Sequence, residues 1–317
     1  MEVEDIIQEV KQEIESFRKA NPDGVVIIRW ATATGKSKLS VLLSQFFDME
    51  IISADSRQIF KYMDIGTDKV SKEILKKIPH HQINIVTPDQ WYTAGQWQAD
   101  VNEIIPQILK KKKLPVIVGG TWLYIDSIYK NFSMPEVAPD YALREKLYAL
   151  EEKTPWYLHQ ELMKLDLEEA NKLHPKSIRY LVRALEICYT SGATKTDSFF
   201  QQPPKWPILL LGLWREKEET NRRINIRIKE MIAGGLIEEV QWLLDKWYDA
   251  KLQSLQGIGY KETVEYLQWE IDMHKLEENM KKATHHLAKK QRTRFRRYII
   301  DEKTGPKERV TYKVWYL

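Results

Sequence analysis

The sequence is poor in features that would mark a secreted or membrane protein. It has one cysteine, Cys188, so no internal disulfide can form, which fits a reducing compartment. The sequence contains no run of about 18 apolar residues, so no membrane span is predicted. Three of the first five residues are acidic, which argues against a secretory or transit peptide. We therefore expect a cytoplasmic protein without a membrane partner, in which Cys188 packs within a helix.

Charge is nearly balanced overall but unevenly placed. The 317 residues contain 49 Lys and Arg against 45 Asp and Glu, a net charge of +4. Residues 275–317 carry thirteen basic against five acidic residues, so the rest of the chain is slightly acidic. Residues 289–298 concentrate the basic charge and interleave it with aromatics. Such a run is either a solvated helix face or a contact surface for nucleic-acid phosphates, and charge alone leaves both open.

Four apolar runs are typical of buried parallel strands, and helical stretches separate them. The runs are residues 25–28, 50–53, 114–118 and 207–213. This alternation predicts an α/β fold with a doubly wound parallel sheet, whose ligands bind at the carboxyl ends of the strands. Segments 30–37, 55–58 and 119–121 each directly follow one of these runs. We therefore expect the three segments to converge on one crevice.

Helical periodicity divides the remainder of the chain. A stretch with scarce glycine has leucines at helical spacing, for example Leu158, Leu162 and Leu165, and predicts a helical insertion in the α/β core. Long helices are expected at about 221–244 and 276–298. The predicted parts are an N-terminal helix in 1–22, the first part of the core in 23–125, the helical insertion in 126–202, a return to the core with a basic helix in 203–300, and a tail in 301–317.

The segment 25–37 is one residue away from a phosphate-binding loop. Gly35-Lys36-Ser37 follows a strand and a short turn and opens a helix, as in the pattern G-x-x-x-x-G-K-[ST] of nucleotide- and ATP-binding proteins. In that pattern backbone N–H groups surround a phosphate, the lysine adds charge, and the Ser hydroxyl holds Mg²⁺. The first glycine is replaced by Trp30. The candidate phosphate-binding residues are Trp30, Ala31, Thr32, Ala33, Thr34, Gly35, Lys36 and Ser37.

Further motifs follow in order along the chain. They are Asp55-Ser56-Arg57-Gln58, Met63–Thr67, Pro79-His80-His81, Gly119-Gly120-Thr121, His174-Pro175 with Arg179 and Arg183–Glu186, Arg223-Ile224-Asn225 with Arg227, and Ile258–Glu262. With the loop, these motifs make the chain closely resemble the tRNA dimethylallyltransferases from about residue 25 to 298. The resemblance implies a P-loop NTPase-like core and a monomer. It also implies transfer of a dimethylallyl group from dimethylallyl diphosphate to the N6 amine of the tRNA adenosine just 3′ of the anticodon.

The resemblance implies which residues stabilise the leaving diphosphate, accept the proton of the amine and bind the tRNA. The leaving diphosphate develops negative charge, which the loop, Lys36 and Mg²⁺ on Ser37 would stabilise. By resemblance Arg223 adds a cation, and Asp55 is the base that accepts the proton of the amine. Thr121 would hydrogen-bond between the amine and the leaving oxygen. The residues that the resemblance assigns to tRNA are Asp55, Ser56, Arg57, Gln58, Thr121, Arg144, Arg179, Arg183, Lys290, Gln291, Arg292 and Thr293.

Several of these residues have a purely structural interpretation as well. Asp55 could cap a helix after its strand, and Thr121 could be a turn residue. Arg179 and Arg183 are four residues apart and would share one solvated helix face. His80 and His81 have no carboxylate or cysteine at metal-ligand spacing, so we expect them to have structural or hydrogen-bonding roles.

Tryptophan stands at four positions where the resemblance predicts glycine: Trp30, Trp122, Trp247 and Trp269. At Trp30 a side chain should crowd the phosphate site. Composition shows the same imbalance, because the chain has 11 Trp but 13 Gly, about 4% against the usual 7% or so. Replacement of one residue type by one other at unrelated positions is not what drift produces. We hypothesise that these codons are UGA, which some bacterial lineages read as glycine.

Two other functions stay open at this point. A P-loop small-molecule kinase would share the loop, but it leaves the helical insertion and the basic helix unexplained. A catalytically inactive RNA-binding relative is favoured by Trp30. Against it, the chain retains Lys36, Ser37, Asp55 and Thr121, which an inactive site has no reason to keep.

Overall fold

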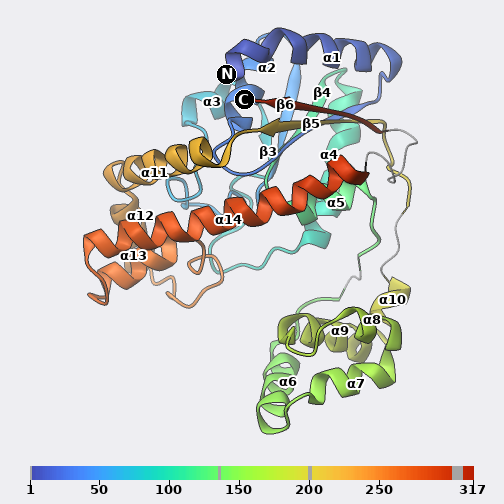
Figure 1. The fold of residues 1–317 in the computed structure, drawn as a ribbon, viewed down its shortest axis with the longest axis vertical. Helices are drawn as coiled ribbons and strands as arrows, with labels where there is room; N and C mark the ends of the chain where they lie inside the picture. The colour runs from blue at the N-terminus through green and yellow to red at the C-terminus, as the bar shows by residue number, and fades with distance from the viewer. Residues whose placement is uncertain (1, 135–136, 199–201, 302–309) are drawn as a thin grey trace. The chain divides into compact units, whose positions relative to one another are not determined.

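The chain folds into two compact units. The computed structural model describes residues 2–134, 137–198, 202–301 and 310–317. Unit 1 comprises residues 1–129 and 204–317, and unit 2 comprises residues 130–203 (Figure 1). The helical insertion was predicted to begin at residue 126. It begins four residues later because helix α5 (Trp122–Tyr129) buries Ile125, Ile128 and Tyr129 in the core of unit 1.

Unit 1 is built on a six-stranded sheet in which every pairing is parallel. The strands are β1 (Val25–Arg29), β2 (Met49–Ala54), β3 (His80–His81), β4 (Leu114–Gly119), β5 (Ile208–Trp214) and β6 (Val310–Tyr316). Their order is β3-β2-β4-β1-β5-β6, so β1 is flanked by β4 and β5. The doubly wound parallel sheet is therefore confirmed. β3 and β6 are additions, and β6 lies in the segment that was predicted to be a tail.

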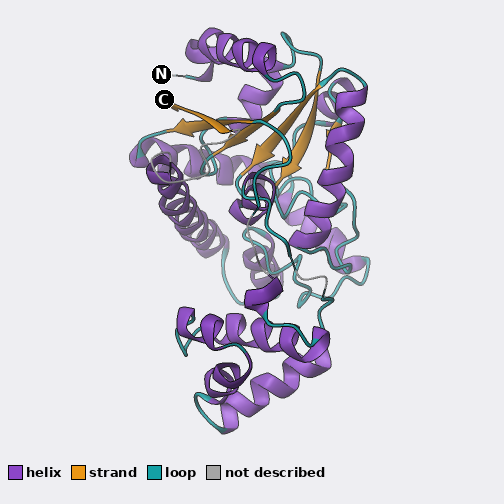
Figure 2. Cartoon of the chain, turned by 90° about the vertical axis from the view of Figure 1, so that its right-hand side faces the viewer, coloured by secondary structure: helices purple, strands orange, loops and turns teal. Residues whose placement is uncertain are grey.

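Both faces of this sheet are apolar and covered by helices (Figure 2). Along β1, Val25 and Ile27 belong to one hydrophobic cluster, whereas Val26 and Ile28 belong to the other. This alternation follows from the period-2 geometry of a strand, and burial on both faces is typical of parallel sheets. The first of these clusters includes residues of α4 (Ala94–Lys110) and α5. The second includes residues of α1 (Ile7–Ala20) and α2 (Lys36–Leu43).

The remaining helices of unit 1 come before β1, between β2 and β3, or after β5 along the chain (Figure 1). They are η1 (Val3–Ile6), α3 (Lys72–Lys77), α11 (Lys217–Ala233), α12 (Leu236–Asp245), α13 (Tyr260–Leu267) and α14 (Met273–Asp301). The helix predicted at 221–244 is thus two helices. The break falls at Gly235, whose φ of 101° is a left-handed conformation that glycine adopts readily.

Unit 2 is entirely helical within its described residues, as the insertion was predicted to be. Its helices are α6 (Tyr141–Lys153), α7 (Tyr157–Leu165), α8 (Leu167–Lys172), α9 (Ile178–Ser191) and α10 (Lys195–Ser198). They enclose a leucine-rich core that includes Leu158, Leu162 and Leu185. Cys188 packs against this core, which confirms the role expected for it.

None of the described helices combines the length with the apolar character that crossing a bilayer requires.

Candidate active site

A cavity of about 520 Å³ lies where strands β1, β2 and β4 end. Its walls come from the segments after these three strands, together with α11 and α14. The predicted convergence of the three segments is therefore confirmed. The predicted site residues that line the cavity are Thr32, Ala33, Gly35, Lys36, Ser37, Asp55, Gln58, Arg223 and Gln291.

The loop after β1 has the backbone of a phosphate-binding turn. Gly35 has φ 103° and directly precedes α2, so the N-terminus of α2 opens at the cavity. Lys36 folds back, and its Nζ donates a hydrogen bond of 2.6 Å to the carbonyl of Ala31. Desolvation lowers the pKa of Lys36 to about 8. The loop therefore offers helix N–H groups and an ammonium that is protonated at neutral pH.

Trp30 does not crowd this loop, so the expectation drawn from its size is wrong. Its side chain is fully buried and is absent from the cavity wall. The indole stacks on Phe295 at 5.9 Å between ring centroids and meets the edge of Trp214 at 5.7 Å. An indole has a large apolar area, and the adjacent core of unit 1 accommodates it. Five residues of the loop consequently keep their access to the cavity, namely Thr32, Ala33, Gly35, Lys36 and Ser37. The predicted phosphate-binding residues Ala31 and Thr34 are fully buried and do not line it.

Asp55 lies in the cavity wall, and the turn that follows it is tied to the turn after β4. Asp55 Oδ1 accepts the backbone N–H of Arg57 at 2.9 Å, so Asp55 caps a turn and not a helix. Thr121 Oγ1 accepts the N–H of Ser56 at 3.0 Å, and the N–H of Thr121 donates to the carbonyl of Ala54 at 3.0 Å. Ser56, Arg57 and Thr121 are not among the cavity-lining residues.

Glycine at the end of β4 allows this close approach. A β-carbon at Gly119 would lie 2.1 Å from the carbonyl oxygen of Ala54, which is far inside van der Waals contact. Any side chain there would push β4 away from β2 and separate Asp55 from Thr121. The Gly-Gly-Thr motif therefore has a structural reason as well as a chemical one.

Gln291 of α14 joins two loops of the site. Its Oε1 accepts the N–H of Thr32 at 2.8 Å, and its Nε2 donates to the carbonyl of Gly120 at 3.0 Å. Only 9% of Gln291 is exposed. The structure thus gives Gln291 a bridging position between the phosphate loop and the Gly-Gly-Thr turn.

Arg223 lies in the cavity wall on α11 and already has two carboxylate partners. Its Nε donates to Glu219 at 2.8 Å, and its Nη2 forms an ion pair with Glu2. Glu2 also lies 3.4 Å from Nη2 of Arg215. Hydrogen bonds from Arg222 and then Arg223 lower the pKa of Glu219 to about 2. The N-terminal segment therefore supplies a negative charge to the arginine that the resemblance assigns to diphosphate.

Arg227 and Asp68 also line the cavity, and the sequence reasoning gave neither a role. Arg227 Nη1 lies 2.8 Å from a carboxylate oxygen of Asp68 and donates to Thr32 Oγ1 at 3.2 Å. Desolvation raises the pKa of Asp68. Arg227 follows Arg223 by one helical turn, so the two share a face of α11, and this spacing was the available signal. Asp68 had no comparable signal.

The oxygen donors of the cavity suit Mg²⁺. The Ser37 hydroxyl and the carboxylates of Asp55 and Asp68 all line it. Among the described residues, no cluster of three or more His, Cys, Asp or Glu could enclose a metal ion. Mg²⁺ binds through one or two protein oxygens and completes its shell with water and substrate phosphate, so Ser37 with Asp55 or Asp68 could hold it.

The arginines predicted in unit 2 differ in their partners. Glu186 is fully buried, and it accepts two hydrogen bonds of 2.8 Å from Arg144 and one of 2.5 Å from Arg183. Arg183 also donates to the carbonyl of Val137 at 2.9 Å. Arg179 is exposed on the same helix, α9. Arg144 and Arg183 thus hold the unit together, whereas Arg179 faces solvent.

The basic stretch of α14 is exposed in part. Lys290 and Thr293 are exposed, and Arg292 is half-buried, with a pKa lowered by desolvation. Arg294 lies over the ring of Trp122, 4.0 Å from its centroid. The side chains of Arg297 and Tyr298 lie outside the described ones.

The paired histidines have the structural role that was predicted. His81 Nε2 lies 2.8 Å from a carboxylate oxygen of Glu50, and His80 Nδ1 lies 2.7 Å from the carbonyl of Ile78. Both therefore fix β3 at the edge of the sheet, and His80 also lines the cavity.

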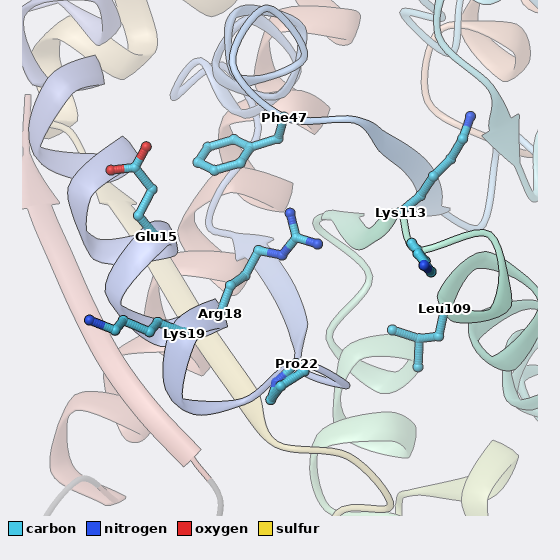
Figure 3. Close-up of a pocket in the computed structure, with 8 residues that line it drawn as sticks. Glu15, Arg18, Lys19, Pro22, Phe47, Leu109 and Lys113 are labelled. Carbon is cyan, nitrogen blue, oxygen red and sulfur yellow. The ribbon is translucent and has the colours of Figure 1, made fainter.

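A second cavity, of about 570 Å³, lies near the start of β2 and β4 (Figure 3). Figure 3 shows Glu15, Arg18 and Lys19 from α1 on one side and Leu109 and Lys113 on the other. None of the residues predicted for catalysis lines it. Ligands of doubly wound sheets bind at the carboxyl ends of strands, so the cavity beside the phosphate loop is the candidate active site.

Known proteins are similar to this chain over most of its length. Among curated relatives, the tRNA dimethylallyltransferase of Pelotomaculum thermopropionicum is 41% identical over 278 residues, covering 86% of this chain and 88% of the relative. The tRNA dimethylallyltransferase of Halothermothrix orenii is 40% identical, and the match covers 86% of this chain and 84% of that relative.

The chain is also similar to solved structures of tRNA prenyltransferases. The tRNA isopentenylpyrophosphate transferase of Bacillus halodurans has a TM-score of 0.63 and 31% identity, covering 93% of this chain and 90% of that one. A eukaryotic dimethylallyltransferase, described as acting on tRNA, has a TM-score of 0.77 and 28% identity, covering 92% and 73%. Residues 58–298 match the sequence profile of the IPP transferase family. This chain therefore belongs to the IPP transferase family.

Proposed function

We propose that this protein transfers a dimethylallyl group from dimethylallyl diphosphate to the N6 amine of the tRNA adenosine just 3′ of the anticodon. The observation that carries the proposal is a single cavity lined by Lys36, Ser37, Asp55 and Arg223. It combines a binding place for a leaving diphosphate with a carboxylate for the acceptor. The names of the relatives support the same reaction.

The diphosphate would bind at the phosphate loop and the arginines of α11. As the allylic C–O bond breaks, its electron pair stays on diphosphate, and the added negative charge needs stabilisation. The helix N-terminus after Gly35, the Lys36 ammonium and Arg223 and Arg227 provide it in one place. Mg²⁺ held through Ser37 would supply further positive charge to the phosphate oxygens.

The adenosine amine would approach from the side of Asp55. As its nitrogen forms the new N–C bond, the nitrogen must lose a proton, and the Asp55 carboxylate would accept it. Thr121 lies in the turn tied to that of Asp55 and would hydrogen-bond the reacting groups. Within a stem–loop, the adenosine must leave its stack to reach a cavity of this kind.

The anticodon stem–loop needs phosphate contacts and surfaces for stacking. We assign these to exposed cations, with Arg179 in unit 2 and Lys290 in unit 1 as the foremost candidates. Ser56, Arg57 and Gln58 would hold the target base and its neighbours. The enzyme would act as a monomer, in the cytoplasm where tRNA is.

The test is transfer of radiolabelled dimethylallyl diphosphate to unmodified tRNA in the presence of Mg²⁺. Label should appear on the tRNA, and its appearance should require the Asp55 carboxylate. Label transfer from ATP to a small molecule would instead indicate the kinase. A folded protein that binds tRNA without transferring label would indicate the inactive RNA-binding relative.

A further inference from the structure

Two helices of unit 1 end in the same unusual way. After α12, Trp247 has φ 66°, and after α13, Trp269 has φ 63°. Both values lie in the left-handed region, where the β-carbon of an L-residue comes too close to the backbone. For a bulky residue such a conformation is an outlier.

The hydrogen bonds at both helix ends form complete Schellman motifs. At the end of α12, Trp247 N–H donates to Leu244 O at 2.9 Å, and Tyr248 N–H donates to Leu243 O at 3.2 Å. At the end of α13 the corresponding bonds run from Trp269 to Tyr266 at 3.0 Å and from Glu270 to Glu265 at 2.9 Å. This motif requires a left-handed residue at the position of each tryptophan, and that residue is usually glycine.

The two indoles gain nothing from packing that would offset the backbone strain. Trp247 is 94% exposed and Trp269 is 93% exposed. Tryptophan normally buries a large part of its surface, so these are positions where neither the backbone nor the surroundings favour it. Gly192, which follows α9 with φ 70°, shows the residue that this chain places at another such helix end.

Trp30 is also unfavourable at its position, because of its indole N–H and not because of its backbone. Its indole N–H is buried, and within the described part of the chain it has no hydrogen-bond partner. A buried donor without a partner costs its full desolvation penalty. Trp97 provides the contrast, because its equally buried indole N–H donates to the carbonyl of Ser53 at 3.0 Å. Position 30 is also the one at which the phosphate-loop pattern has glycine.

We propose that positions 30, 247 and 269 are glycine in the protein as its own cells make it, through UGA codons read as glycine. The phosphate loop would then match its full pattern, and α12 and α13 would end as α9 does. Trp122 is not included, because it begins α5 beneath Arg294 and its backbone has no feature that requires glycine.

The codons of the source DNA decide the proposal. We expect TGA at positions 30, 247 and 269 and TGG at Trp97, the matched control. TGG at the three positions would overturn the proposal. Peptide masses of the protein purified from its own cells give a second measurement, and tryptophan in those peptides would overturn it equally. Neither readout depends on the enzymatic activity.

A stability measurement tests the backbone argument on the chain as written. Trp247→Gly and Trp269→Gly should each raise the Tm by about 2 °C or more, because each relieves a left-handed residue. Trp91→Gly is the matched control. Trp91 is also exposed, but its φ is not positive, so glycine relieves no backbone strain there. A gain at Trp91 equal to that at Trp247 and Trp269 would contradict the argument.

Discussion

The cavity of unit 1 and the helices of unit 2 use charge in opposite ways. In the cavity, Lys36, Asp55 and Arg227 line an open space that a ligand could occupy. In unit 2, Arg144 and Arg183 converge on the buried Glu186, so their charge is paired within the protein. Motifs at strand ends therefore predicted which side chains come together better than arginines on a helix did, because sheet topology brings strand ends together.

The largest effect is expected at the carboxylate of the cavity. Asp55→Asn removes the proton acceptor but keeps the shape and the turn, so kcat should fall by about 10²- to 10⁴-fold with little change in tRNA affinity. Steady-state transfer and a tRNA binding titration measure the two quantities. Asp48→Asn, at an exposed carboxylate before β2, is the control and should leave both unchanged. Weaker tRNA binding with an unchanged kcat would show that Asp55 acts in binding alone.

The next effect concerns stability in unit 2. Glu186→Gln leaves Arg144 and Arg183 without their buried partner and should destabilise the unit by about 3 kcal/mol. Denaturant unfolding measures the loss.

Arg179→Ala should leave stability unchanged and weaken tRNA binding, with a salt dependence shallower by about one phosphate contact.

The outcome of this pair sharpens the comparison between the units. Arg144→Ala without loss of stability, but with loss of tRNA binding, would mean that its charge serves RNA after all. The structural assignment of the Glu186 cluster would then be wrong.

A pH effect is expected at the phosphate loop. The pKa of Lys36 in the free protein is lowered to about 8, so the ammonium is present below this pH and is lost as the pH rises through it. The KM for dimethylallyl diphosphate should therefore increase above pH 8, by at most about tenfold per pH unit. Lys36→Arg keeps its charge at these pH values and should flatten the profile. An unchanged profile in that variant would exclude Lys36 as the cause.

The smallest effect is expected at the N-terminus. Glu2 competes with diphosphate for Arg223, so Glu2→Gln should lower the KM for dimethylallyl diphosphate by less than about fivefold, as befits an exposed ion pair. Glu15→Gln removes the exposed pair with Lys11, at 3.7 Å and away from the cavity, and serves as the control. A higher KM in Glu2→Gln would mean that Glu2 positions Arg223 for the ligand.

The sequence predicted the central strands of the sheet from consecutive apolar residues, although in β2 these are only Ile51 and Ile52 between Glu50 and Ser53. It missed β3, which has two residues, and β6, where Thr311 and Lys313 interrupt the apolar pattern. β6 is an edge strand, and edge strands need less apolar sequence than central ones.

The chemistry of the site was predicted where it lies in local motifs, as at Lys36 and Asp55. Asp68 and Glu2 were missed because their roles depend on contacts with α11, far along the chain. The position of Trp30 was also misjudged. Its size was apparent from the sequence, but the space beside Phe295 that receives the indole was not.

The most direct test is nucleoside analysis of unmodified tRNA after incubation with this protein, dimethylallyl diphosphate and Mg²⁺. The account predicts N6-dimethylallyl adenosine at the position just 3′ of the anticodon, and none with Asp55→Asn. The account would be contradicted if this adenosine stayed unmodified although the protein is folded and binds the tRNA. That result would have to hold both for the chain as written and for the variant with glycine at positions 30, 247 and 269.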